Sequence, residues 1–442
     1  MSHFLCFILS VCLSLLGLLF RPPAAHAGTK QSPSAHAAVP LTLTDCIRLA
    51  EASEPFLLLQ KAQRLFADAL VTQAQALPNP NLSYVAQDVG LQGANGPLLL
   101  HQATIGFAPF LALVRIQEAR AASAGQRQTE ASIEVERLKL RESVGRAFYE
   151  LLMLEKIHRV EAEFAVLAAQ LVTDSQVRKR LGDASGLDVL RAEAERDDAS
   201  RQVENSAHAL RIAQLAFSLA LGEPFPQPIA LEEDSPQALV ALPERIVEAL
   251  GRVAPTDVEL QRQVLVKLAE SNRPELKQAL AEKRQSELLS QLAALRAMPL
   301  SDVQVSAGIR HAQAGIGGLV SISGSLPILD WNQGARQLAS AQGVRAQARL
   351  AESRLQIWLE IESSLRNFYH ARTQRTQHML PLVERRRLAL ATTRRLFAEG
   401  LVSYSDVVLA SRELLAAQRT LHQIERDVLL SRWRLAVALG AW

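Results

Sequence analysis

Cysteine is scarce in this sequence, and its distribution excludes two kinds of site. Of three cysteines in 442 residues, Cys6 and Cys12 lie in the apolar stretch at the N-terminus, and only Cys46 lies beyond it. If that stretch is removed on export, as argued below, the mature chain has one thiol. A single thiol forms neither an intrachain disulfide nor a cysteine-based metal site.

A strong net charge is also absent. The formal net charge is +3, and it falls to +2 without residues 1–27, because Arg21 is the only charged residue there. Nucleic-acid-binding proteins show a basic face and usually a basic total. The composition therefore argues against nucleic acid as a partner.

Motifs of catalysis and cofactor binding are missing as well. The sequence has no Gly-rich phosphate loop, no G-x-S-x-G elbow and no H-E-x-x-H zinc motif. His370 and His378, eight residues apart, are more typical of a solvated helix face than of a metal site. We therefore predict no enzyme activity, no catalytic residues, no metal site and no cofactor.

Long hydrophobic runs are confined to the N-terminus. The apolar run Phe4–Phe20 is followed by two prolines and then by Ala25-His26-Ala27, a pattern that signal peptidase cleaves. We predict a signal peptide at residues 1–27, with an uncleaved anchor as the alternative, and a disordered leader at residues 28–40. No later stretch approaches the roughly 18 apolar residues of a transmembrane helix. Such an exported protein is periplasmic, secreted or an outer-membrane β-barrel.

What the sequence does contain is an internal duplication. Two stretches of about 40 residues repeat at one constant offset of 218 residues, which indicates a repeat. The positions related by this offset are Gly182 and Gly400, Ser185 and Ser403, Asp188 and Asp406, Val189 and Val407, and Leu221-Gly222 and Leu439-Gly440.

Each repeated stretch predicts a tight turn between two helices. Gly182 and its copy can adopt the positive φ that ends a helix, and the serine three residues later can cap the next helix. The aspartate after it, Asp188 or Asp406, then stabilises the positive end of the helix dipole. From spacing alone, this structural role is the more frequent one for such an aspartate.

The helices around these turns are predicted to be very long. Residues 110–181 and 328–399 have helical composition over about 70 residues each, which corresponds to roughly 105 Å. After each turn, large residues recur at one heptad position and mostly small ones at another, which predicts coiled-coil packing. An ordinary helical hairpin in a globular bundle would show the same heptad pattern, but its helices would be shorter.

Two segments change to the period of a β-strand. Residues about 81–108 and 302–327 alternate apolar and polar side chains around glycine-rich turns. The strand length suits a transmembrane β-hairpin, and it would also suit a half-buried hairpin in a soluble protein. The pattern before the first hairpin predicts a helix over Leu43–Ala76.

These patterns divide the mature chain into three parts. The two copies are residues 41–222 and 271–442. Between them, residues 223–270 form a proline-rich, acidic connector in which short helices are expected at residues 244–251 and 256–270.

The order of these elements resembles the TolC family of outer-membrane efflux channels over about Leu41–Trp442. The pieces that carry the resemblance include ALPNPNLSYV, RPELKQA, DWNQGARQLASAQ and GLVSYSDVVLASREL, and several of them favour the CzcC-like heavy-metal branch. The resemblance implies a passive export duct from the periplasm to the exterior. Its partners would be a periplasmic adaptor (membrane fusion protein), an inner-membrane pump and outer-membrane lipid.

The expected fold is a duplicated TolC-like fold, mainly α with a membrane β-barrel. Four strands cannot close a barrel, and an open edge is unstable in lipid, so we expect a homotrimer with a 12-stranded barrel and a long helical periplasmic barrel. Heavy-metal or drug export would be the function. A periplasmic or secreted coiled-coil adaptor or scaffold is the alternative, and it would need no β-hairpins.

The resemblance also implies roles for the turns. Asp406 and Asp188 match acids of the periplasmic gate, whereas Leu409 replaces a second acid and Val402 replaces a basic latch partner. The turns themselves match the positions where an adaptor docks, with Gly182 and Ser185 in the first and Gly400 and Ser403 in the second.

Overall fold

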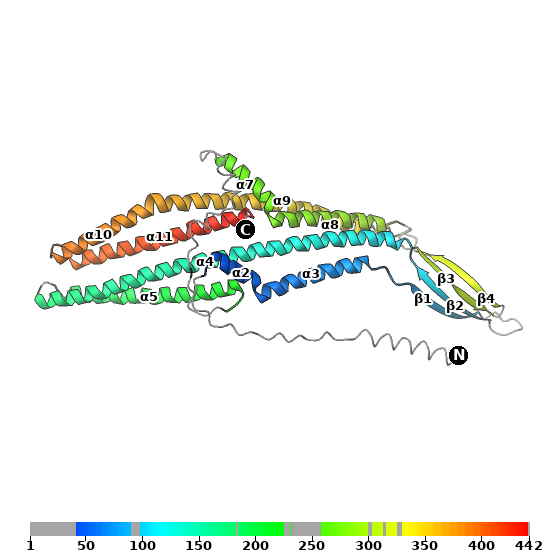
Figure 1. Cartoon of the computed structure of the whole chain (residues 1–442), viewed down its shortest axis with the longest axis horizontal. Helices are drawn as coiled ribbons and strands as arrows, with labels where there is room; N and C mark the ends of the chain where they lie inside the picture. Colours follow the sequence, from blue (N-terminus) through cyan, green and yellow to red (C-terminus); the bar gives the residue numbers. More distant parts are fainter. Residues whose placement is uncertain are drawn as a thin grey trace. The chain divides into compact units, whose positions relative to one another are not determined.

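The computed structural model describes residues 41–89, 98–182, 184–224, 231, 258–298, 303–312, 315–324 and 329–440. The predicted signal peptide and leader, and the helix expected at residues 244–251, lie outside these ranges. Residues 40–442 form one compact unit (Figure 1).

The fold is mainly α with one four-stranded antiparallel sheet, as predicted. The elements are α2 (Leu43–Ala52), α3 (Glu54–Gln75), β1 (Asn81–Val89), β2 (Leu98–Phe107), α4 (Leu111–Leu181), α5 (Gly186–Leu221), α7 (Val258–Asn272), α8 (Pro274–Arg296), β3 (Gln304–Ala312), β4 (Gly315–Ser323), α9 (Gln333–Thr373), the π-helical turn η2 (Gln374–Met379), α10 (Leu380–Ala398) and α11 (Tyr404–Ala438).

The helical pattern over Leu43–Ala76 is divided into two helices by an extended Ser53. Pro55 lies in the first turn of α3, where its missing N–H is not needed, but inside one continuous helix it would remove a hydrogen bond. The second copy repeats this break at Arg273, directly before Pro274. The duplication therefore includes the break.

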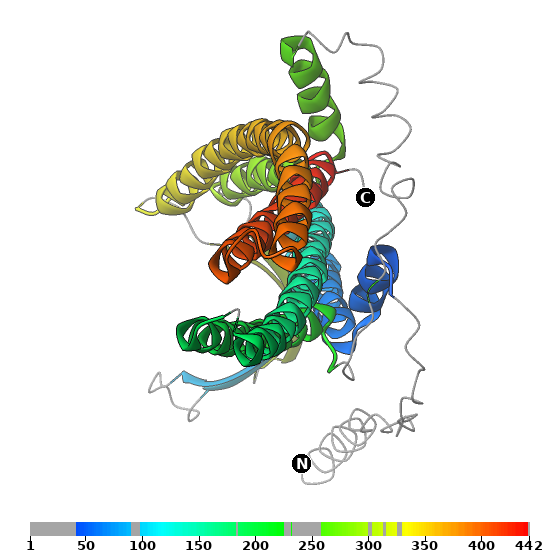
Figure 2. The ribbon, with the colours of Figure 1, turned by 90° about the vertical axis from the view of Figure 1, so that its left-hand side faces the viewer.

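The helices lie side by side in a curved wall, from which α7 projects (Figures 1 and 2). Near the sheet, the contacts run in the order α3, α4, α8, α9, and beyond the middle of α4 they run α5, α4, α11, α10. The wall thus has one lateral edge formed by α3 and α5 and another formed by α9 and α10. Among the described residues, none of the helices combines the length and hydrophobicity needed to cross a bilayer.

The largest hydrophobic core lies where α2, α4, α5 and α11 meet. Phe148, Phe217 and Trp433 are completely buried in it. Gly145 on α4 permits this packing, because a Cβ placed there would overlap the indole ring of Trp433. The last helix of the second copy is therefore packed directly onto the first copy.

The long helix expected over residues 328–399 begins at Gln333 and is interrupted by η2, unlike the continuous 71-residue α4. Pro381, in the first turn of α10, explains the difference, because it cannot donate the hydrogen bond that a regular helix requires there. The chain changes direction between α9 and α10 (Figure 1).

The four strands pair in the order β1-β2-β3-β4, so the pairing of β2 with β3 joins the two copies. The register puts Leu82 opposite Ile105, Ile105 opposite Ala307, and Ala307 opposite Val320. These side chains share one face. Its large members are highly exposed, Leu82 and Val320 at 74% each.

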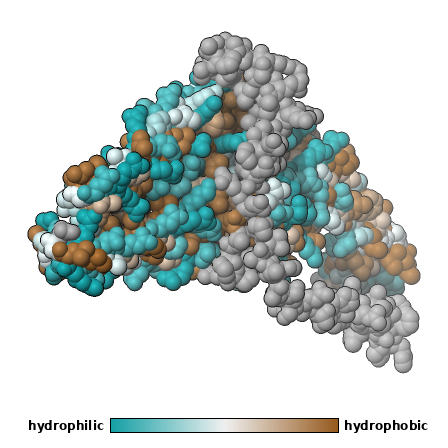
Figure 3. Space-filling view, turned by 60° about the vertical axis from the view of Figure 1, so that its left-hand side comes forward, coloured by the Kyte–Doolittle hydropathy of each residue, from teal (hydrophilic) through white to brown (hydrophobic). Residues whose placement is uncertain are grey.

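The other face of the sheet is predominantly polar. Hydroxyl groups pair across the strands, with 2.7 Å between Ser83 Oγ and Thr104 Oγ1 and also between Ser306 Oγ and Ser321 Oγ. Figure 3 shows hydrophobic residues gathered at the end of the molecule that carries the sheet, whereas the visible helices are largely hydrophilic. A sheet with an exposed apolar face and a polar opposite face has the pattern of a lipid-facing and a lumen-facing surface.

Candidate functional site: the helix ends at the two turns

The two turns have the backbone conformation that the sequence predicts. Gly182 and Gly400 have φ of 85° and 77°, the left-handed values that glycine adopts without strain. Gly182 caps the C-terminus of α4, and Ser185 and Ser403 are the N-caps of α5 and α11. Each copy thus contains a tight reversal between two long helices.

Each serine and aspartate form a reciprocal cap. In the first copy, the backbone N–H of Ser185 donates to Asp188 Oδ2 at 3.0 Å, and the N–H of Asp188 donates to Ser185 Oγ at 3.2 Å. In the second, the N–H and hydroxyl of Ser403 donate to Asp406 Oδ2 at 2.9 Å and 2.6 Å. The serine hydroxyl, followed by the serine N–H, holds the pKa of each aspartate below its usual value.

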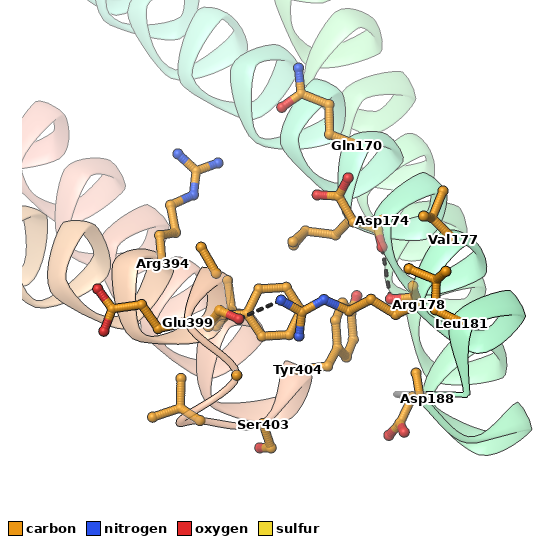
Figure 4. A pocket seen from close by; sticks show the side chains of 18 of the residues that line it. Gln170, Asp174, Val177, Arg178, Leu181, Asp188, Arg394, Glu399, Ser403 and Tyr404 are labelled. Atoms are coloured by element: carbon orange, nitrogen blue, oxygen red, sulfur yellow. Dashed lines mark hydrogen bonds between the residues drawn. The ribbon is translucent and has the colours of Figure 1, made fainter.

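A groove with a volume of about 1190 Å³ lies between the two helix hairpins (Figure 4). Asp188, Gly400 and Ser403 line it, together with Ala184 and Val402, so it brings residues of both turns together. Gly182 and Ser185 flank Ala184 in the chain, and Asp406 is not among the lining residues. The groove is built from α4, the start of α5, the end of α10 and the start of α11.

Arg178 crosses this groove from the last turn of α4 toward the α10–α11 hairpin (Figure 4). Its guanidinium donates a hydrogen bond to the carbonyl oxygen of Phe397 and lies 3.8 Å from the centre of the Phe397 ring. A charged donor also suits this place, because the carbonyl groups at the end of α10 carry the negative end of the helix dipole. Arg178 therefore joins the two hairpins.

A second link joins the hairpins through α5 and α11. Arg412 Nε donates to Glu195 Oε1 at 2.8 Å, and the Glu195 side chain is only 6% exposed. Tyr404 lies beside this pair, and burial, followed by the charge of Glu195, raises the pKa of Tyr404 to about 12. Leu409 lines the neighbouring groove with Tyr404 and Arg412.

Sequence reasoning missed Arg178 and Arg412. The partners of these two residues lie more than 200 positions away in the chain, and neither arginine belongs to the repeated turn motif. The only local signal was the basic last turn of α4, which contains Arg178, Lys179 and Arg180. Within the part of the chain that the structure describes, no three His, Cys, Asp or Glu side chains converge as a metal site would require.

Comparison with known proteins links this architecture to efflux channels. The family described as "Outer membrane efflux protein" matches residues 265–441. The cobalt-zinc-cadmium resistance protein CzcC of Cupriavidus metallidurans is 24% identical over 425 residues, which cover 94% of this chain and 92% of CzcC.

Solved structures share the fold over nearly the whole chain. The outer membrane protein VceC of Vibrio cholerae matches with a TM-score of 0.71 at 18% identity, covering 90% of this chain and 96% of VceC. CusC, whose structures describe transmembrane channel formation, matches with a TM-score of 0.73 at 16% identity, covering 95% of this chain and 98% of CusC.

Proposed function

Residues 265–441 match the outer membrane efflux protein family, and from this premise we propose that the chain is the passive exit duct of a tripartite efflux system. It is an outer-membrane channel that extends into the periplasm, in a family of channel proteins rather than enzymes. The β-sheet carries this conclusion, because the alternative, a coiled-coil adaptor, would need no strand with an exposed apolar face.

A homotrimer would complete the channel. One chain leaves β1 and β4 unpaired on their outer sides, and an open strand edge is unstable in lipid. Joining β4 of one copy to β1 of the next is a heterologous contact, which closes into a ring. Three copies give twelve strands, an even number above the minimum of eight.

The lateral edges of the helical wall support the same assembly. On one edge, α3 and α5 expose Phe66 at 69% and Leu219 at 83%, and on the other, α9 exposes Val344 at 65%. Exposed apolar rows of this extent mark interaction surfaces. Since β1 follows α3 and β4 precedes α9, the contact that joins the strands would also cover these rows.

We place the periplasmic adaptor at the groove between the turns, with an inner-membrane pump beyond it. Ala184 and Val402 line this groove from the first and second copies. Cysteines introduced at these two positions, in a background without the buried Cys46, should form disulfides with a cysteine-bearing helical hairpin of the adaptor. A cysteine at Gln333, near the sheet, is the matched control. Cross-links from position 333 alone would contradict this placement.

Asp406 is the residue that we expect to control ion selection at the entrance. Three copies would place three carboxylates around a narrow passage, and a focused negative field concentrates cations. Hydrogen bonds from the hydroxyl and the backbone N–H of Ser403 lower the pKa of Asp406, so its carboxylate stays ionised to a lower pH than an ordinary aspartate does. Asp406→Asn should therefore reduce cation selectivity in planar bilayers, whereas Asp188→Asn should act mainly on opening. Unchanged selectivity of the Asp406 variant would leave that residue only its capping role.

The cargo class that we propose is the divalent transition-metal cation. The name of CzcC, a cobalt-zinc-cadmium resistance protein, supports this proposal. An acidic entrance would suit such a cargo by raising its local concentration.

A further inference from the structure

Arg310 is an isolated charge on the polar face of the sheet. It is the seventh residue of β3 and lies near the hairpin end, away from the helices. The register places it between Gln102 on β2 and Gly317 on β4, and its side chain is exposed. The alternation of β3 puts it on the face of Ser306 rather than on the apolar face of Ile309.

In the part of the sheet that the structure describes, the two strands next to Arg310 carry no acidic residue. The strands and the segments that connect them, residues 81–107 and 303–323, contain a single acid, Asp88. Asp88 is on β1, paired with Leu99 and therefore two strands away from Arg310. The same residues contain no other lysine or arginine. The barrel wall therefore has one fixed positive charge per chain on its polar side.

We propose that Arg310 forms a ring of three positive charges near the outer opening of the channel and sets the ionic selectivity of the exit toward anions. This inference rests on the proposed function, because the ring requires the trimer and a water-filled lumen. Fixed charges along a narrow pore raise the local concentration of the opposite ion. Arg310 would concentrate small anions at the end opposite to Asp406, where they would balance the charge of the exported cations.

A neighbouring glycine leaves room for this arrangement. Gly317 stands directly opposite Arg310 on β4, and a Cβ at Gly317 would meet nothing within 4 Å. A long guanidinium side chain can therefore extend over β4 into the lumen without competing for space. This placement makes Arg310 a selectivity residue for the ions that pass, in contrast to a structural ion pair.

Reversal potentials of the purified full-length protein in planar bilayers, under a KCl gradient, test the proposal. Arg310→Gln should raise the ratio of potassium to chloride permeability by about twofold or more, and Arg310→Glu should raise it further. Arg310→Lys should keep the wild-type ratio. The shift should fade in 1 M salt, where the Debye length is about 3 Å.

His311→Gln is the matched control, because His311 is the next residue on the same strand and belongs to the opposite, apolar face. It should not change the permeability ratio. An Arg310→Gln channel with the wild-type ratio, in a preparation where Asp406→Asn does shift it, would overturn the proposal for Arg310 alone. A wild-type protein that forms no channels would overturn the proposed function and this inference with it.

Discussion

Val320→Lys should prevent most of the protein from assembling into stable trimers in the outer membrane. Val320 lies near the middle of β4 on the exposed apolar face, opposite Ala307. A lysine near the midplane of a lipid-facing barrel wall costs about 2–4 kcal/mol. The measurement is the amount of heat-modifiable trimer in the outer-membrane fraction, compared with wild type on unboiled gels.

Leu319→Lys provides the matched control. Leu319 precedes Val320 on the same strand, and its partner Gly308 is on the polar face with Ser306. A lysine there would point into water, so trimer yield should stay near that of wild type. Equal losses for the two variants would show that the faces are assigned wrongly.

The cost of a lysine on this face should depend on its position along the strand. On the same apolar face, Val305→Lys should cost less than Val320→Lys. Val305 is only the second residue of β3 and pairs with the last residue of β2, Phe107. A lysine at this end can reach the interface, where the cost falls to about 0–1 kcal/mol.

Arg178→Gln should make the channel open more readily. The change removes both the stacking on Phe397 and the charged hydrogen bond to its carbonyl group. A hydrogen bond to a charged group contributes about 1.5–3 kcal/mol, and each 1.4 kcal/mol changes an equilibrium about tenfold. The open-to-closed ratio should therefore rise about tenfold or more in single-channel recordings.

Arg180→Gln separates this effect from a general loss of charge at the helix end. Arg180 is exposed in the same last turn of α4. Arg180→Gln should open as rarely as wild type, and Arg178→Lys should fall between wild type and Arg178→Gln. If the two glutamine variants opened equally often, Arg178 would have no role in holding the hairpins together.

Local chemistry made the turns predictable. A glycine at positive φ, a serine cap and an acid three residues later are short-range requirements, so Gly182, Ser185 and Asp188 indicated the turn without knowledge of the fold. The period-two alternation indicated the strands for the same reason, because successive side chains of a strand point to opposite faces. The constant offset then located the same elements in the second copy.

Contacts between distant segments could not be predicted in this way. Arg178 reaches a backbone carbonyl group, and any residue could supply that group. The break at Ser53 and the interruption at η2 both depend on a proline in the first turn of the following helix. The composition favoured a helix on both sides of each proline. The hydrogen bonding where the first helix meets the second depends on how the neighbouring helices pack.

The π-helical turn η2 makes the two copies no longer interchangeable. The first copy spans the corresponding distance with one unbroken α4, whereas the second divides it into α9 and α10. A chain assembled from two first copies would keep the turns, the heptad patterns and the strand count, but it would replace the interrupted helix with an unbroken one. The duplicated halves have therefore diverged in the geometry of their long helices, although their turn motifs have stayed the same.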